Sequence, residues 1–319
     1  MRKAWMAATC ALAAVVAAAP CAIAQNENEG QGQVVVTALP KNDKQPSADV
    51  SQQAIRGLQV NGKKANVTNW TPMRGQNAGV ELVLLIDGGA RTSLGRELDD
   101  ISKFVQSLPP NVKIALAYME SGSARMAGPL TADHAQAAKE LHLPMGIPGY
   151  SASPYFCLSS LAKNWPSRET DVRREVIMIT DGVDYYHMHY DPDDPYVQSA
   201  MNDAARANLV VYSIYWKSTG PADHTWYETN AGQNLLQEVT QSTGGNSYWM
   251  GFGNPVSLSP YFDDFSRRLN NQYELGFAAP LKGNKPELEQ LKLKIDDSKV
   301  KVDAPQRVLV APQGANSGS

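Results

Sequence analysis

The sequence predicts an α/β fold, with a doubly wound, mostly parallel central sheet, helices on both faces, and small flanking β segments. Three observations support this prediction. Residues 80–87 form a near-continuous apolar run, which is typical of a strand buried on both faces of a parallel sheet. The later apolar runs are separated by single stretches of helical periodicity, as in βαβ units. Short segments of alternating polarity lie before and after this region.

The α/β region is predicted to span residues 78–280. The helix after Asp87 has apolar residues at spacings of three and four, which predicts a stripe that covers the sheet. Ser153-Pro154 combines a capping residue with a proline at the first helical position. The predicted strands are 80–87, 114–119, 176–180, 209–216 and 272–277, and the predicted helices run up to 108 and over 131–141, 153–165, 195–208, 233–242 and 258–270.

Residues 1–24 have the pattern of a secretory signal peptide. Arg2 and Lys3 precede an apolar stretch, and Ala22-Ile23-Ala24 provides a small-residue cleavage site. We therefore expect an exported chain, periplasmic or secreted after cleavage near Ala24. Lipidation of Cys21 is a weaker alternative, because the residues around it fit a lipoprotein signal poorly. No later segment is long and apolar enough to span a bilayer, so no transmembrane segment is expected in the mature chain.

Two β-rich segments are predicted to flank the α/β region. Residues 25–32 are polar and are predicted to be a disordered linker. Residues 33–77 form a small N-terminal β-rich segment, in which Asn61-Gly62 favours a hairpin turn. Residues 281–312 alternate in polarity and predict a C-terminal β-hairpin, which is followed by a disordered tail at 313–319.

Charge and cysteine content exclude some classes of protein. The formal net charge is −3, and no stripe of Lys and Arg is present, which argues against a nucleic-acid partner. After cleavage of the signal peptide, Cys157 is the only cysteine, so no disulfide can form within the chain. Its place within a predicted helix favours a small buried apolar residue over a nucleophile.

Aspartates end two of the predicted parallel strands. Asp87 ends the strand at Leu85-Ile86-Asp87-Gly88, and Asp181 follows Ile179-Thr180 in the same way. The first and fourth strands of a doubly wound sheet are neighbours at the switch point, so both carboxylates are expected in one crevice. A divalent cation with further oxygen ligands would suit such a pair. Without a cation or a basic side chain, their repulsion would raise one of the two pKa values.

The chain contains an ordered set of motifs. They are Leu-Leu-Ile-Asp-Gly-Gly (84–89), Pro-Leu-Thr-Ala-Asp (129–133), Arg-Arg-Glu-Val-Ile-Met-Ile-Thr-Asp-Gly-Val-Asp (173–184), Val-Val-Tyr-Ser-Ile-Tyr (210–215), Thr-Gly-Gly-Asn-Ser-Tyr (243–248) and Leu-Asn-Asn-Gln-Tyr-Glu-Leu-Gly-Phe (269–277). Together these motifs resemble the von Willebrand factor type A domain. The resemblance covers about residues 33–310, with the domain itself at 78–280, and is strongest to the branch found in exported bacterial proteins. It implies a non-catalytic module that recognises a protein partner.

The resemblance also implies a candidate metal site. The family typically binds Mg²⁺ through Asp-x-Ser-x-Ser, a threonine from a second loop, and an aspartate after the fourth strand. Asp87 and Asp181 match the two aspartates, and Ser153 is the best match for the threonine, with Ser151 next. The two serine positions of the first motif hold other residues in this chain.

Gly89 and Arg91 stand where the family has its two serines, and two hypotheses follow. Water, or Thr92 and Ser93 in a shifted register, could complete a Mg²⁺ site. Alternatively, the guanidinium of Arg91 pairs with the aspartates in place of the cation. We favour the second hypothesis and expect no cofactor, with Mg²⁺ as the alternative.

The loop after Asp181 is rich in aromatic and titratable residues. Tyrosine is favoured at protein interfaces, because its apolar ring and polar tip are both useful there. Packing of the tyrosines within the loop is an equally good interpretation. His187 and His189 with nearby carboxylates could also bind a transition metal, although the sequence defines no third ligand. The predicted partner-binding residues are Arg91, Ser151, Asp184, Tyr185, Tyr186, His187, His189 and Tyr190.

The sequence therefore predicts an exported, non-catalytic module that recognises a protein partner through the carboxyl edge of its sheet. The first alternative is a metal-dependent hydrolase or phosphatase that uses Asp87 and Asp181, since other doubly wound folds place nucleophilic aspartates at this position. The second alternative is a purely structural component of the bacterial envelope.

Overall fold

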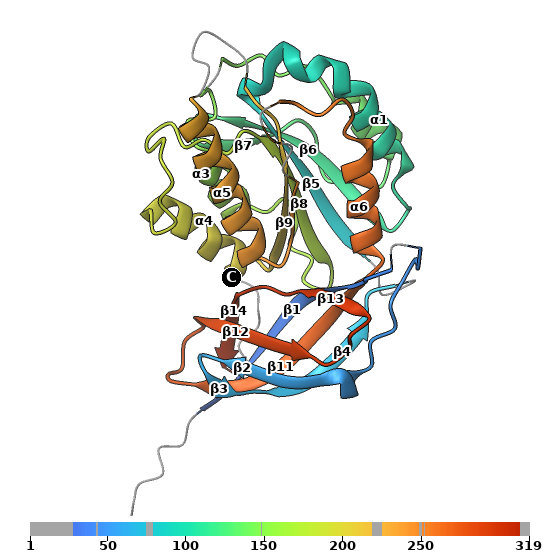
Figure 1. Cartoon of the computed structure of the whole chain (residues 1–319), viewed down its shortest axis with the longest axis vertical. Helices are drawn as coiled ribbons and strands as arrows, with labels where there is room; N and C mark the ends of the chain where they lie inside the picture. The colour runs from blue at the N-terminus through green and yellow to red at the C-terminus, as the bar shows by residue number, and fades with distance from the viewer. Residues whose placement is uncertain are drawn as a thin grey trace, which may run out of the picture.

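The computed structural model describes residues 28–312, except 43, 75–78, 148, 219–224, 249, 250 and 252, and except the side chains of 28, 91 and 92. The predicted signal peptide and the predicted tail lie outside the described residues. The chain folds into two parts that lie end to end (Figure 1). We call residues 79–271 the α/β part and residues 28–74 with 272–312 the β part. No helix among the described residues is long and apolar enough to cross a membrane.

The α/β part is built on a six-stranded sheet. Its strands follow the order β10-β9-β8-β5-β6-β7, so β5 lies beside β8, which is the fourth strand of this sheet because the unpredicted β7 precedes it. Neighbouring strands are parallel except at β7, which pairs with β6 in the antiparallel direction. The strands are β5 (Val80–Asp87), β6 (Val112–Glu120), β7 (Ser123–Met126), β8 (Arg173–Thr180), β9 (Leu209–Tyr215) and β10 (Ser247–Tyr248).

Helices cover both faces of this sheet, because its central strand is apolar on both sides. In β5, Leu82, Leu84 and Ile86 pack toward α1 and α6, whereas Val83 and Leu85 pack toward α3, α4 and α5. Figure 1 shows the two helical layers on either side of the strands. The helices are α1 (Leu98–Ser107), α2 (His134–Lys139), α3 (Pro154–Lys163), α4 (Pro195–Arg206), α5 (Trp226–Ser242) and α6 (Ser259–Leu269).

The segment that follows Asp87 differs from the predicted helix. Residues Gly88–Glu97 form a 3-10 helix, η3, and the α-helix α1 begins only at Leu98. The backbone N–H of Gly89 donates to Asp87, so the chain turns tightly at the end of the strand. Glycine and serine weaken α-helical propensity in this stretch. The predicted apolar stripe is nevertheless present, because Leu94 and Ile101 are both fully buried.

The β part is an antiparallel sheet of eight strands, larger than the small flanking segments that we predicted. The mixed α/β class is confirmed, but many of the strands lie in this second sheet. The strands run in the order β3-β2-β12-β14-β1-β11-β4, and β13 pairs with β1. They are β1 (Asn28–Pro40), β2 (Ile55–Val60), β3 (Lys63–Lys64), β4 (Asn66–Pro72), β11 (Gln272–Leu281), β12 (Glu287–Ile295), β13 (Val300–Asp303) and β14 (Arg307–Pro312), with the 3-10 turn η1 at Gln52–Ala54.

Three predicted boundaries are wrong in this part. Residues 28–32, predicted as linker, begin β1, because they pair along β11 from Asn28↔Leu281 onward. The strand β11 therefore lies in the β part and not in the α/β region. Residues 281–312 do not form a simple hairpin, since β12 pairs with β2 and β14 while β13 pairs with β1. The hairpin turn at Asn61-Gly62 is confirmed, with φ values of 50° and 74°.

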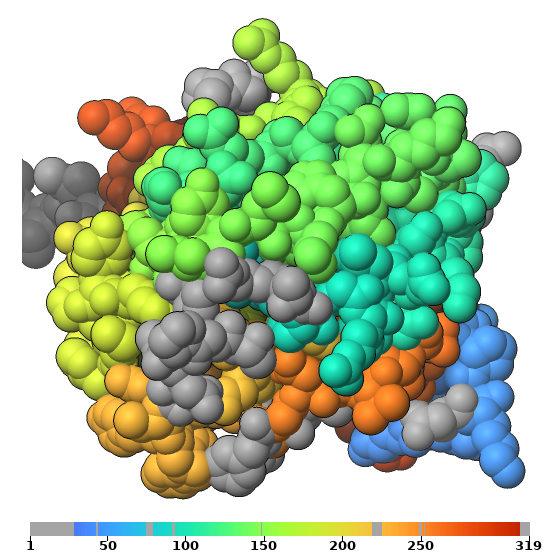
Figure 2. Space-filling view, turned by 90° about the horizontal axis from the view of Figure 1, so that it is seen from above, coloured from blue at the N-terminus to red at the C-terminus, as the bar shows by residue number. Residues whose placement is uncertain are grey.

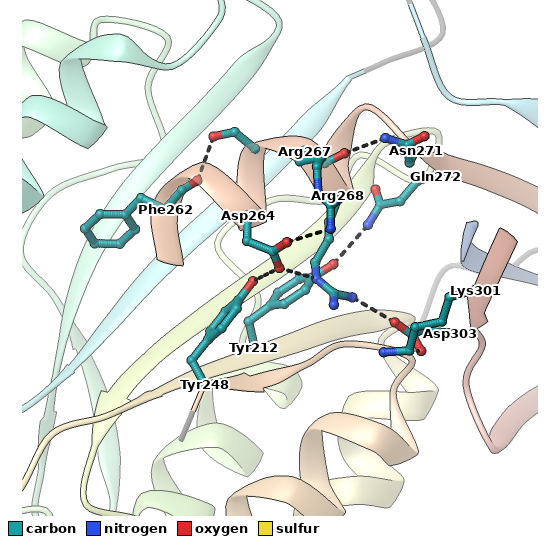
Figure 3. Close-up of polar contacts among 11 residues, drawn as sticks. Tyr212, Tyr248, Phe262, Asp264, Arg267, Arg268, Asn271, Gln272, Lys301 and Asp303 are labelled. Carbon is teal, nitrogen blue, oxygen red and sulfur yellow. Dashed lines mark hydrogen bonds and ion pairs between the residues drawn. The ribbon is translucent and has the colours of Figure 1, made fainter. Parts of the chain in front are cut away.

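A buried polar cluster joins the two parts (Figure 3). Arg268 of α6 is 4% exposed and donates to Asp264 of the same helix at 2.7 Å and to Asp303 of β13 at 2.9 Å. Beside it, Nε2 of Gln272 at the start of β11 donates to the hydroxyl of Tyr212 in β9 at 3.2 Å. The β part is therefore held under the sheet by charged groups as well as by packing.

Replacing Arg268 with Met is expected to lower the free energy of unfolding by about 3 kcal/mol, because two partly buried carboxylates lose their shared cation. Equilibrium urea unfolding followed by circular dichroism measures the change. The matched control is Arg267→Met on the same helix. Arg267 is more exposed and has an ion pair with Asp264 of 3.2 Å, so its loss is expected to cost about 0–1 kcal/mol. Equal losses in the two variants would contradict the role given to Arg268.

Candidate functional site

The candidate site lies at the carboxyl ends of β5 and β8, which pair in parallel from Val80↔Arg173 to Ile86↔Ile179. This register brings Asp87 and Asp181 together at one edge of the sheet. Their side chains are almost completely buried, with 3% and 1% exposed respectively. The two carboxylates therefore lie under the surface of the edge.

The carboxylate of Asp87 is held by protein donors on both oxygens. Oδ1 accepts from the backbone N–H of Gly89 at 2.8 Å, and Oδ2 accepts from the hydroxyl of Thr180 at 2.6 Å. Burial and the nearby charge of Asp181 raise the pKa of Asp87 to about 7, although these hydrogen bonds oppose the rise. Asp87 therefore holds its proton to a higher pH than an exposed aspartate does.

The chain leaves Asp181 through a turn that requires glycine. Oδ1 of Asp181 accepts from the backbone N–H of Val183 at 3.0 Å. Gly182 has a φ of 71°, and a Cβ there would lie 2.5 Å from the backbone oxygen of Gly232. The hydroxyl of Tyr155 donates to the carbonyl of Gly182 at 2.7 Å. Helices α3 and α5 therefore fix the turn from both sides.

The second loop of the site brings Ser151, and not Ser153, next to Asp87. The hydroxyl of Ser151 is buried, lowers the pKa of Asp87, and makes no hydrogen bond of good geometry within the described residues. Ser153 caps α3 by accepting from Tyr155 N–H at 3.3 Å, and its hydroxyl lowers the pKa of Asp184. Between them Ala152 has a φ of 64°, which turns the two serines apart.

The donor atoms present do not make up the usual Mg²⁺ set. Gly89 contributes no side-chain oxygen. The hydroxyl of Ser93 donates to the Ala90 carbonyl at 2.7 Å and accepts from Trp216 at 2.9 Å, so a shifted register does not bring it to the aspartates. The side chains of Arg91 and Thr92 lie outside the described part of the structure. Among the described side chains, two aspartates and Ser151 remain, and Mg²⁺ prefers six oxygen ligands in near-octahedral geometry.

Two tyrosine rings cover the edge above the aspartates. A Cβ at Gly88 would lie 2.9 Å from the ring of Tyr150, and a Cβ at Gly149 would lie 2.8 Å from the ring of Tyr185. Burial, together with the charges of Asp181 and Asp87, raises the pKa of Tyr185 well above its usual value. Tyr185 is half-buried and lies close to both carboxylates.

The remaining predicted partner-binding residues are in the loop from β8 to α4. Tyr186, His187, His189 and Tyr190 are exposed, whereas Asp184 is buried. Nδ1 of His187 lies 2.8 Å from Oδ2 of Asp194, which caps α4. The structure thus separates an exposed group of rings from a buried carboxylate.

Several exposed apolar side chains at the same edge were missed by the sequence reasoning. Met145 is 89% exposed and Val256 is 97% exposed. Both lie in loops with proline or glycine nearby, where an apolar residue has no helical or strand period to explain it. That is the signal that could have identified them. We define the apolar rim as Met145, Ile147, Tyr150, Tyr186, Met188, Tyr190, Tyr196, Trp226, Tyr227 and Val256.

Comparisons with known proteins give structural matches only. No protein-family model and no curated protein sequence matches the chain. The similar solved structures are proteins with von Willebrand factor type A domains.

Three of them can be described. An aerotolerance-related membrane protein from Bacteroides fragilis is 14% identical, covers 60% of this chain and 99% of its own, and has a TM-score of 0.42. The conserved hypothetical protein BatB from Bacteroides thetaiotaomicron is 17% identical, with 60% and 97% covered and a TM-score of 0.41. The ArnB paralog VWA2 from Sulfolobus acidocaldarius is 10% identical, with 88% and 76% covered and a TM-score of 0.39.

Replacing Asp87 with Asn should flatten the pH dependence of stability. The raised pKa means that the folded chain keeps the Asp87 proton when the unfolded chain, with its ordinary value of 3.8, has lost it. The contribution of Asp87 to stability therefore falls as pH rises from about 4 to about 7, and the amide removes this contribution. We expect the unfolding free energy of the variant to rise by about 2–4 kcal/mol relative to that of the unchanged chain over this range.

Urea unfolding at pH 4, 5, 6 and 7 measures this difference. Burial also raises the pKa of Glu175, to about 8, so part of the fall is common to both proteins and the comparison isolates Asp87. The matched control is Asp193→Asn, which removes one exposed carboxylate from the loop before α4. A pH profile of Asp87→Asn that parallels the unchanged chain would show that Asp87 is ionised throughout.

Proposed function

We propose that the chain is an exported, non-catalytic module with a von Willebrand factor type A domain. In this proposal it recognises a protein partner through the carboxyl edge of the α/β sheet, without a Mg²⁺ ion. The observation that carries the proposal is the apolar rim, a set of exposed apolar and aromatic side chains on loops and helix starts at the carboxyl edge of the sheet.

The rim consists of side chains from four separate segments. Met145 and Ile147 precede α3, Tyr186 and Met188 follow β8, Trp226 begins α5, and Val256 precedes α6. Each segment follows a strand end or leads into a helix at the same edge, and Figure 2 shows the molecule from this side. Exposed apolar and aromatic residues that gather at one edge of a domain are typical of protein interaction sites.

The geometry of Asp87 supports binding without Mg²⁺. Both of its oxygens accept hydrogen bonds from the protein, and its raised pKa weakens its charge at neutral pH. A cation would have to displace Thr180 or Gly89 as donors. In this proposal the rim, not an ion at the aspartates, supplies the contacts to the partner.

The same geometry is unfavourable for the hydrolase alternative. A nucleophilic aspartate must be ionised and reach its substrate, whereas Asp87 is buried and partly protonated. Cys157 is also buried, and burial raises the pKa of its thiol far above the usual range. The structural alternative predicts no partner at the rim, and the binding experiment below separates it from our proposal.

Mg²⁺ is expected to change the melting temperature by less than about 1 °C. A ligand that binds only the folded chain stabilises it in proportion to the logarithm of its concentration over its dissociation constant. Differential scanning fluorimetry of EDTA-treated chain with increasing MgCl₂ measures the effect. A rise of several degrees that is absent in Asp87→Asn would show that the aspartates bind the ion after all.

Partner recognition is tested with variants of the rim. A photo-crosslinking residue at position 186 is used to identify the partner in native envelope extract, and binding of the purified partner is then measured by calorimetry. Tyr186→Ala with Met145→Ser is expected to weaken binding at least about tenfold, because exposed aromatic anchors dominate interface energies. Asp87→Asn is expected to change affinity by less than about twofold.

The control for this experiment is Met126→Ser. Met126 is an exposed apolar residue of β7, outside the rim, so its replacement changes hydrophobicity without touching the proposed site. Binding that is weakened equally by Met126→Ser and by the rim variant would contradict recognition by the rim. A chain that crosslinks no protein at position 186 would favour the structural alternative.

A further inference from the structure

Three potential metal ligands converge in the loop between β8 and α4. They are Asp184, His187 and Asp194, and each offers an atom within 4.8 Å of the others. Asp184 follows the end of β8, His187 is three residues further, and Asp194 is the N-cap of α4. The sequence pattern had suggested His187 with His189 but had defined no third ligand. The structure supplies two carboxylates instead.

One oxygen in this cluster is buried and lacks a partner. Asp184 is 2% exposed, and its Oδ2 makes no hydrogen bond with any described residue. The Ser153 hydroxyl lies on this side and favours the charged carboxylate, but it does not reach Oδ2 in good geometry. A buried carboxylate oxygen without a donor is costly in a folded protein unless a cation or a water compensates it.

Backbone donors hold the two carboxylates in the same way. Oδ1 of Asp184 accepts from the N–H of Tyr186 at 2.9 Å, and Oδ1 of Asp194 accepts from the N–H of Tyr196 at 2.8 Å. In both residues the backbone occupies Oδ1, which leaves Oδ2 of Asp194 at 2.8 Å from His187 and Oδ2 of Asp184 without a hydrogen-bond donor among the described residues. Ligating carboxylates are commonly oriented by such outer hydrogen bonds.

We propose that Asp184, His187 and Asp194 bind one Zn²⁺ ion. One imidazole nitrogen and two carboxylate oxygens match the ligands that zinc takes, whereas Mg²⁺ and Ca²⁺ prefer oxygen alone. In a tetrahedral site with bonds of about 2.0–2.2 Å, ligand atoms lie about 3.3–3.5 Å apart. The 2.8 Å separation of His187 and Asp194 needs a small opening, which the exposed imidazole of His187 allows. The fourth position is open to water.

The ion would link the two ends of the loop, at Asp184 and Asp194. Closing a loop by a metal stabilises the folded state, because the ligands are brought together only there. This loop contains Tyr186, Met188 and Tyr190 of the apolar rim. The zinc site does not depend on the proposed partner, however, and its test uses the chain alone.

The test is a zinc titration of full-length chain purified without a histidine tag and stripped with EDTA. A chromogenic chelator competes for Zn²⁺, and Co²⁺ is used as a spectroscopic probe. We expect one Zn²⁺ per chain, a melting temperature that rises with Zn²⁺, and Co²⁺ absorption typical of tetrahedral coordination. His187→Ala, at an exposed position that tolerates replacement, is expected to lower the affinity at least about tenfold and to abolish the rise.

Asp194→Asn extends the test, because asparagine still caps α4 but is a poor zinc ligand. It should fold with an unchanged circular dichroism spectrum and lose affinity as His187→Ala does. Retention of full zinc affinity by either variant would overturn the proposal, as would the absence of zinc binding to the unchanged chain.

The matched control is His189→Ala in the same loop. The ring of His189 lies 6.0 Å from that of His187, centroid to centroid, and is not one of the three converging ligands. It is expected to keep zinc affinity within about twofold. An equal loss in His189→Ala and His187→Ala would mean that both histidines bind the ion, and the proposed set of three ligands would be wrong. Loss of binding in Asp87→Asn would place the ion at the aspartates of the sheet edge.

Discussion

The placement of two carboxylates side by side under the carboxyl edge of the sheet is the constraint on which this end of the molecule depends. The parallel pairing of β5 with β8 brings Asp87 and Asp181 together, and burial keeps water from screening them. Backbone and hydroxyl donors stabilise the carboxylate of Asp87, and its pKa is raised. No basic side chain among the described ones is hydrogen-bonded to it. The Thr180 hydroxyl and the turn at Gly88-Gly89 follow from that requirement.

At a metal-dependent edge, the charged centre would also be the surface that contacts a partner. Burial of Asp87 and Asp181 separates the charged centre from the exposed surface. The charged centre is buried next to Tyr185, while exposed apolar side chains such as Met145 and Val256 lie on the loops of the same edge. An interface built this way gains its free energy from removing apolar area from water. The buried aspartates then contribute to the shape of the edge through the turns that they cap. Electrostatic attraction to a partner has a smaller share in such an arrangement.

The sequence predicted the α/β part well, because its signals are local. The apolar run of β5, the proline after Ser153 and the two strand-end aspartates each depend on neighbouring residues. The β part was underestimated, since pairing of β1 with β11 joins residues about 240 positions apart, for which periodicity holds no information. The choice of Ser151 over Ser153 depends on a positive φ at Ala152, which a non-glycine residue rarely adopts. Exposure of Met145 and Val256 is likewise a tertiary property.

The loop from β8 to α4 has a carboxylate at each end, and together these can serve a purpose separate from the edge of the sheet. Asp194 must cap α4, and Asp184 must follow the turn that leaves Asp181, so both carboxylates are fixed by local folding before any ligand is considered. The second oxygen of Asp194 contacts His187, and the second oxygen of Asp184 has no hydrogen-bond donor among the described residues. The hydrogen bonds at the turn and at the start of α4 already position both carboxylates, so the ligand set needs no further strained backbone conformation. The lack of oxygen ligands around Asp87 and the convergence of ligands around Asp184 therefore have separate structural causes. Metal binding at one of the two places does not depend on metal binding at the other.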